Sequence, residues 1–424
     1  MAILKSVNKF KKIFLIPLLL IHLILLINTT FTLWPEMVVY PYLLNNGFAL
    51  YKDIINPYPP TLPIALSAFT RLFGYEQQGF HLLTMAIILV SDSILYFITL
   101  KIQKNHYHAT FAVLFFVILS IPFSVNGLWF DLVQLPFILL AIFFFIKYLE
   151  SKKTTAVIFS FILLIFAFYI KQQVLWLILA ISAIVLFYER KKFRNLMNIF
   201  LISLAVLFAG FLFQYLILEK QNTKEFVFWV FRFPFVEASK MPGYILLPTI
   251  KQLVIVLSLF ALFIQTILFG SKSHKYILLL SALSLLFAYP RFDYFHLVPM
   301  LSIISIVAVP NFLSLVNARI PVKIVVLIAL FSISIFSFRY FKLNYNSETR
   351  FFETDIVASA KFINRITQDN NVIYVQNGPD QLYPLSNTLP PKPWADEFPW
   401  YLELPGIQES IIEGLQRESP SFVI

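Results

Sequence analysis

Two carboxylates, Glu36 and Asp53, lie in a segment between long apolar runs, residues 32–79. A carboxylate that is partly shielded from water can accept the proton of an attacking hydroxyl group. Aromatic neighbours such as Tyr40 and Tyr51 can shape an apolar groove beside such a base. Because exposed carboxylates are common, the alternative is that both acids are simply solvated.

A second polar group, Arg291, Asp293 and His296, interrupts the apolar sequence near the other end of the chain. Charged groups at membrane depth are costly, and they are usually paired or functional. A guanidinium binds phosphate oxygens in a bidentate manner, and a histidine can bind or protonate them. The alternative is an Arg291–Asp293 pair that only caps helix ends at the membrane interface.

A short turn between two apolar runs contains Lys171 and Gln172. These side chains could contact a phosphate or a sugar, or the lysine could simply snorkel to the lipid headgroups. Asp131 begins another apolar run and is expected to pair with Lys171 or Arg291. Asp92, inside an apolar run, is either functional or part of a buried structural pair.

The composition excludes a soluble globular domain. Apolar residues make up 59% of the chain and charged residues 13%, whereas soluble domains have about 25% charged residues. The absence of cysteine excludes disulfides, thiolate nucleophiles and cysteine-bound metals. No glycine-rich phosphate loop, metal-binding histidine motif or serine elbow is present, so the residues demand neither a metal nor another cofactor.

Apolar runs long enough to span a membrane predict an all-α polytopic membrane protein with about eleven transmembrane helices. Basic residues gather in the N-terminal segment, at Lys5, Lys9, Lys11 and Lys12, and in alternate loops. This bias predicts a plasma-membrane protein whose N-terminus is cytoplasmic. This pattern explains the net charge of +11 better than nucleic-acid binding does. The predicted spans are 13–31, 80–100, 109–122, 129–147, 155–170, 172–188, 196–218, 244–269, 276–289, 295–315 and 322–339.

The pattern divides the chain into a transmembrane domain, 1–341, with a first external loop at 32–79, and an extracytoplasmic tail, 342–424. Within the loop, residues 61–74 are expected to form an amphipathic or half-embedded helix. The tail is net acidic and is patterned as a small α/β domain, which we expect to be truncated or to end on an edge strand. A core of about 80 residues is marginal, so the tail should pack on the membrane part. Its expected elements are helices at 356–366 and 407–415 and strands at 372–375 and 421–424.

The segment 32–79 resembles the first external loop of the GT-C glycosyltransferases, most of all the branch with protein O-mannosyltransferases and aminoarabinose transferases. That branch has an Asp-Glu pair after the first helix, which corresponds to Pro35-Glu36 here. The resemblance implies a catalytic base at Glu36, one methylene longer than Asp. The alternatives are a base at Asp53 or an inactive relative, and Glu36 is favoured over Asp53. The matching residues are Glu36, Tyr40, Gly47, Tyr51-Lys52-Asp53, Pro59-Pro60 and Leu72-Phe73-Gly74.

The resemblance implies a membrane glycosyltransferase that uses a polyprenyl-phosphate-linked sugar and a lipid, glycan or protein acceptor. Arg291, His296 and Lys171 would then neutralise the departing phosphate, while the tail would hold the acceptor or cover the site. The alternatives are a transporter or lipid flippase, which should show inverted repeats and broken helices, and a non-catalytic membrane scaffold. No internal repeat is visible in the sequence.

Overall fold

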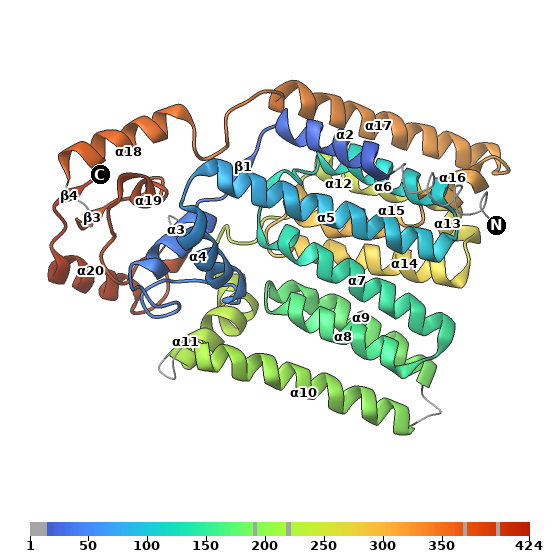
Figure 1. Ribbon diagram of the computed structural model, residues 1–424, viewed down its shortest axis with the longest axis horizontal. Coiled ribbons are helices and arrows are strands. Elements are labelled where there is room, and N and C mark those ends of the chain that lie inside the picture. Colours follow the sequence, from blue (N-terminus) through green and yellow to red (C-terminus); the bar gives the residue numbers. More distant parts are fainter. Residues whose placement is uncertain (1–14, 190–192, 218–221, 368–370, 396–398) are drawn as a thin grey trace, which may run out of the picture.

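The computed structural model describes residues 15–189, 193–217, 222–367, 371–395 and 399–424. The basic residues at positions 5, 9, 11 and 12 therefore lie outside the described residues. Most of the apolar sequence forms helices, as expected in lipid, where each backbone polar group must be satisfied within the chain. These helices run side by side as one bundle (Figure 1).

The bundle is built from long and short apolar helices. Its interior is a continuous cluster of aliphatic and aromatic side chains. The helices are α2 (Leu15–Ile27), α5 (Gln77–Gln103), α6 (His106–Ser120), α7 (Phe130–Ser151), α8 (Thr154–Phe168), α9 (Leu175–Glu189), α10 (Phe193–Ile217), α12 (Ile250–Ala261), α13 (Ile264–Phe269), α14 (Lys272–Leu283), α15 (Val298–Ser305), α16 (Ala308–Leu315) and α17 (Ile320–Asn344).

Four described helices are long and apolar enough to cross a membrane, and a fifth is counted if a bent pair forms one span. That pair, Tyr294–Ser305 and Ala308–Leu315, is bent by 64°. Six shorter apolar helices accompany them. The predicted run 244–269 is helical only from Ile250 and breaks again before Ile264. The membrane character is clear, but the number of eleven spans stays a prediction, since apolar composition does not reveal where a helix is interrupted.

The segment 32–79, expected as a loop, contains two helices, α3 (Glu36–Asn45) and α4 (Thr61–Phe73), which pack against each other. The helix at α4 was predicted, whereas α3 was missed because Pro41 lies inside it. A proline lacks the N–H that a helix interior needs, so it argues against a helix in sequence reasoning. The prediction of an irregular segment holds only for the proline-rich stretch that follows α3.

A small parallel sheet joins this segment to the bundle. Strand β1 (Thr32–Leu33) pairs with β2 (Gly127–Leu128), with Leu33 opposite Leu128. Because parallel strands end at the same edge, the residues that follow them emerge together. Helix α3 begins soon after β1, at Glu36, and α7 begins soon after β2, with Asp131 in its first turn.

The tail contains helices and strands where they were predicted, at α18 (Thr354–Ile366), α20 (Ile407–Glu418), β3 (Ile373–Tyr374) and β4 (Phe422–Val423). It adds α19 (Leu382–Ser386), and β3 pairs with β4 in parallel. Each strand has only two residues, so a separate α/β domain and a division at residue 341 stay predictions.

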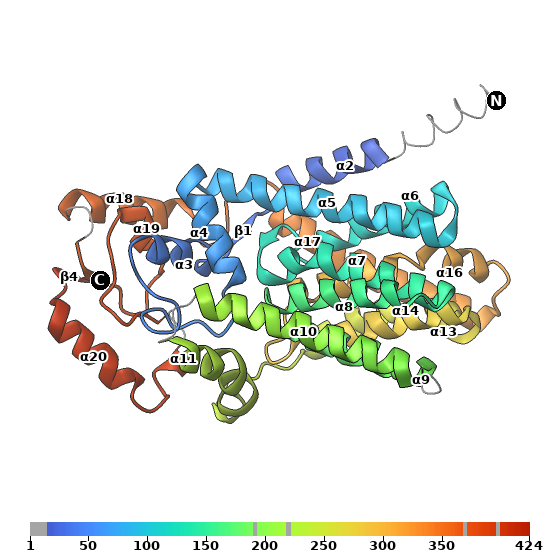
Figure 2. The ribbon, with the colours of Figure 1, turned by 60° about the horizontal axis from the view of Figure 1, so that its bottom comes forward.

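The tail shares its core with the outer segment. Tyr383 and Trp394 belong to the same buried cluster as Tyr40 and Ile54. The backbone N–H of Trp394 donates to the carbonyl of Asp53 at 2.7 Å. The tail, α3, α4 and α11 (Thr223–Val227) thus gather at one end of the bundle (Figures 1 and 2), and together they enclose the space described next.

Candidate active site

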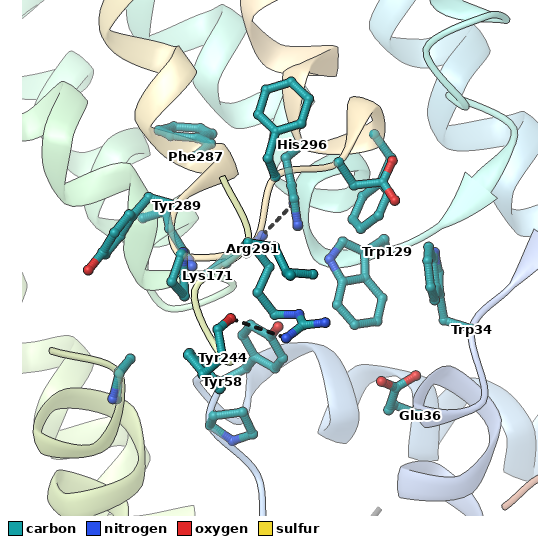
Figure 3. A pocket seen from close by; sticks show the side chains of 18 of the residues that line it. Trp34, Glu36, Tyr58, Trp129, Lys171, Tyr244, Phe287, Tyr289, Arg291 and His296 are labelled. Atoms are coloured by element: carbon teal, nitrogen blue, oxygen red, sulfur yellow. Dashed lines mark hydrogen bonds between the residues drawn. The ribbon is translucent and has the colours of Figure 1, made fainter. Parts of the chain in front are cut away.

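A cavity of about 360 Å³ lies where the bundle meets the outer segment and the tail. Residues from widely separated parts of the chain line it, and many are aromatic (Figure 3). The polar and aromatic lining includes Trp34, Glu36, Tyr58, Trp129, Lys171, Gln172, Gln173, Tyr244, Arg291, Asp293, His296, Arg350, Trp400 and Tyr401.

A buried ionic network lies in one wall of this cavity. Asp131 Oδ2 is 2.6 Å from Lys171 Nζ and 2.7 Å from His296 Nδ1. The two nitrogens are 3.1 Å apart, and the other carboxylate oxygen accepts from Gln134 at 3.2 Å. The side chains of Asp131 and Lys171 are each 1% exposed. Since a buried charge needs a partner, the carboxylate accounts for the presence of an ammonium group here.

Three elements position this network. Asp131 is in the first turn of α7, Lys171 precedes the short helix η2 (Gln172–Val174), and His296 is in the helix η7 (Tyr294–Leu297). The expected pairing of Asp131 with Lys171 is confirmed. The sequence did not reveal that His296, 125 residues beyond Lys171, joins the same carboxylate.

Arg291 is held over the cavity by backbone and aromatic groups. Its Nη1 donates to the carbonyl of Tyr244 at 3.1 Å, and its guanidinium lies 4.4 Å from the ring of Trp400. The nearby Asp293 accepts from the backbone N–H of Tyr294 at the start of η7. Asp293 therefore caps η7, while Arg291 presents a positive charge to the cavity.

Glu36 approaches the cavity from a different side. It is the first residue of α3 and is only 8% exposed. In Figure 3, Glu36 lies across the cavity from Lys171, with Arg291 between them. The start of a helix carries partial positive charge, which stabilises a carboxylate at this position. One acid thus faces a set of cationic groups across an aromatic space.

The chain is similar to known proteins in part of its sequence and in its fold. The sequence profile described as dolichyl-phosphate-mannose-protein mannosyltransferase matches residues 58–213. ArnT from Cupriavidus metallidurans in the apo state matches 98% of this chain and 89% of its own, with a TM-score of 0.58 at 11% identity. The same protein bound to undecaprenyl phosphate gives a TM-score of 0.57 at 10% identity, with 96% and 88% covered. No curated protein sequence matches the chain.

The chain has the GT-C fold. The resemblance inferred from residues 36–74 is therefore confirmed at the level of the fold. Within this GT-C fold, the cavity brings together six of the predicted site residues: Glu36, Lys171, Gln172, Arg291, Asp293 and His296.

The other three predicted site residues, Tyr40, Tyr51 and Asp53, are absent from the described cavity lining. Tyr40 packs edge-on against Trp394 in the core shared with the tail. Tyr51 donates its phenol to the carbonyl of Tyr58 at 2.8 Å, and burial raises its pKa well above the ordinary value. These tyrosines support the wall rather than face the cavity.

Asp53 supports the outer segment. Its Oδ2 accepts from the backbone N–H of Ala49 at 3.0 Å and lies 3.8 Å from Lys392 Nζ of the tail. These contacts hold the loop closed and account for the carboxylate without catalysis.

We therefore expect Asp53→Asn to retain sugar transfer close to that of the wild type, with a loss of stability of about 1 kcal/mol or less. Initial rates and the apparent melting temperature in detergent measure the two effects. A loss of transfer without a loss of folded protein would return Asp53 to the list of candidate bases.

Gln172 faces the cavity and also joins two parts of its wall. It lines the cavity, yet its Nε2 donates to the carbonyls of Pro57 and Val230 at 2.8 and 3.4 Å. The side chain therefore ties the proline-rich stretch to the helix η4 (Phe228–Glu237). Farther along, Arg232 and Lys240 both pair with Glu237 and are largely exposed.

Asp92 belongs to a buried structural pair rather than to the candidate site. Its Oδ2 is 2.6 Å from His22 Nδ1, and both side chains are completely buried between α2 and α5. Neither residue is among the described residues that line the cavity. This pair holds the first helix, which leads directly into β1.

Sequence reasoning missed the indoles of the cavity. Trp34 and Trp129 follow the paired strands, and their rings are 5.1 Å apart. A signal was present, because each tryptophan is followed two residues later by an acid, in Trp-Pro-Glu and Trp-Phe-Asp. The parallel strands place the two tryptophans next to each other at the cavity.

Proposed function

We propose that this protein is a membrane glycosyltransferase that moves a sugar from a polyprenyl-phosphate donor to an acceptor hydroxyl. The observation that carries the proposal is the cavity with Glu36 on one side, Lys171 and His296 on the other, and Arg291 between them. The GT-C fold supports it, and so does the undecaprenyl phosphate bound to ArnT from C. metallidurans.

The reaction assigned to this geometry is a single displacement. Glu36 takes the proton of the acceptor hydroxyl as its oxygen forms a bond to the anomeric carbon. The bond from that carbon to the phosphate oxygen breaks, and its electron pair leaves with the polyprenyl phosphate. Attack opposite to the leaving group inverts the anomeric centre.

The cationic wall would stabilise the charge that develops on the phosphate. Arg291 supplies a guanidinium, which suits phosphate oxygens. Lys171 and His296 reach the same space, and their carboxylate partner holds them in place before the substrate arrives. Such preorganised groups lower the barrier because they need not rearrange as charge moves.

The side of the membrane follows from the charge pattern. The loops with Lys101, Lys152 and Lys272 lie at the end of the bundle opposite the tail (Figures 1 and 2). Under the positive-inside rule, this arrangement supports an extracytoplasmic position for the cavity and the tail. Arg350 and Trp400 of the tail line the cavity, which supports a role for the tail in holding the acceptor.

The test is release of polyprenyl phosphate. Purified protein in liposomes receives a panel of polyprenyl-phosphate sugars together with an envelope extract as acceptor. Release together with labelled acceptor supports the transferase. Movement of the intact donor across the bilayer without cleavage would instead establish a flippase. If no donor is either cleaved or moved, the proposal is contradicted.

A further inference from the structure

We propose that the indole N–H of Trp129 donates a hydrogen bond to a phosphate oxygen of the donor, as a neutral member of the phosphate-binding wall. The proposal rests on the proposed function and adds a catalytic residue to it. Trp129 is 6% exposed and lines the cavity. Its Nε1 is sealed from water and has no hydrogen-bond partner within the described part of the chain.

An unpaired buried donor is costly, which indicates that an acceptor arrives from outside the chain. A buried polar group without a partner costs about 1–3 kcal/mol. A phenylalanine would fill much of the same space without this cost. The cost is recovered if a ligand oxygen reaches the N–H. Because Nε1 is buried, the atoms that cover it must move for the ligand to reach it.

The position of the nitrogen points to the phosphate rather than to the acceptor. In Figure 3 the nitrogen lies on the side of the ring that faces His296 and Arg291, away from Glu36. Asp131, which holds Lys171 and His296, is only two residues farther along. The donors therefore converge on one region of the cavity, and Glu36 remains across from them.

The ring is held firmly enough to aim its N–H. It contacts Trp34, Tyr58 and Phe295 at centroid distances of 5.1, 5.7 and 5.8 Å. The backbone carbonyl of Trp129 also accepts from the N–H of Leu132 at 3.1 Å. An aimed donor stabilises a phosphate oxygen most when negative charge develops on it, so its contribution should be larger in the transition state than in the bound substrate.

The charge of the wall gives a reason for a neutral donor. The ammonium of Lys171 already faces the carboxylate of Asp131 at 2.6 Å, so part of its charge is compensated before the phosphate binds. An indole N–H adds a donor without adding a buried charge that would itself need a partner.

The test compares Trp129→Phe with Trp229→Phe. Trp229 is 4% exposed and packs against Phe233 and Tyr401 in the core shared with the tail, outside the described cavity lining. We expect Trp129→Phe to lower kcat by about 10- to 100-fold while its apparent melting temperature stays at or above the wild-type value. Trp229→Phe should lower the melting temperature through lost packing and leave kcat near the wild-type value.

A second measurement separates this proposal from the proposed function. Undecaprenyl phosphate alone, in detergent micelles, should raise the melting temperature of the wild type and raise that of Trp129→Phe markedly less. This arm reports binding even if no donor sugar in the panel is transferred. An equal ligand shift in both proteins, or a loss of kcat that only follows a loss of folded protein, would overturn the proposal. The absence of any shift in the wild type would overturn it as well.

Discussion

Replacement of Glu36 with glutamine is expected to reduce sugar transfer by about 100-fold or more, the scale for loss of a general base. The amide keeps the size of the side chain and its place at the start of α3, but it cannot take up the acceptor proton. Because Glu36 is nearly buried and lines the cavity, loss of its charge should alter the chemistry more than the fold. Initial rates of polyprenyl-phosphate release at saturating donor measure the effect.

Two companion variants sharpen this result. Glu36→Asp shortens the side chain by one methylene and retains the carboxylate, so we expect intermediate activity. Asp53→Asn, which changes an acid in the same outer segment but outside the described cavity lining, should remain active. Full activity in Glu36→Gln, with the same melting temperature as the wild type, would exclude this residue as the base.

Replacement of Asp131 with asparagine should be among the most destabilising single changes in the chain. It leaves the ammonium of Lys171 buried without its partner 2.6 Å away. Breaking a buried ion pair by removing one side costs about 3–5 kcal/mol. We expect a large fall in the apparent melting temperature in detergent and little folded protein at physiological temperature.

A double variant separates stability from catalysis. Asp131→Leu combined with Lys171→Met replaces both charges with apolar groups, which is often neutral for stability. We expect the double variant to recover much of the melting temperature while transfer remains lost. Glu237→Gln, at an exposed pair with Arg232, provides the surface control and should barely change the melting temperature. Recovery of transfer in the double variant would show that Lys171 does not act on the phosphate.

The class of the protein could be predicted from its residues alone because membrane insertion is a matter of composition and length. Low charge and long apolar runs leave helices as the way to satisfy the backbone in lipid. Local periodicity was also sufficient for the helices at Thr61–Phe73, Thr354–Ile366 and Ile407–Glu418. The number of spans was not predictable in the same way, because bends and short breaks depend on packing between helices.

The site was partly visible in the sequence. Charges amid apolar residues identified Lys171, Arg291 and His296, since the cost of burying a charge makes it conspicuous. Glu36 came from the family resemblance. The same reasoning also selected Asp53. The sequence does not show whether an acid in a loop faces a cavity or accepts a hydrogen bond from a backbone N–H, as Asp53 does from Ala49.

What the sequence by itself determined is the presence of costly polar groups in an apolar chain, and hence the kind of chemistry they support. Only the tertiary structure decided which of them meet. Two strands of two residues, too short to show periodicity, bring Trp34 against Trp129 at the cavity. The packing of distant helices then brings His296 to the carboxylate that Lys171 already binds. Contacts between residues far apart in the chain carry no local signal, because they arise from the burial of whole helices.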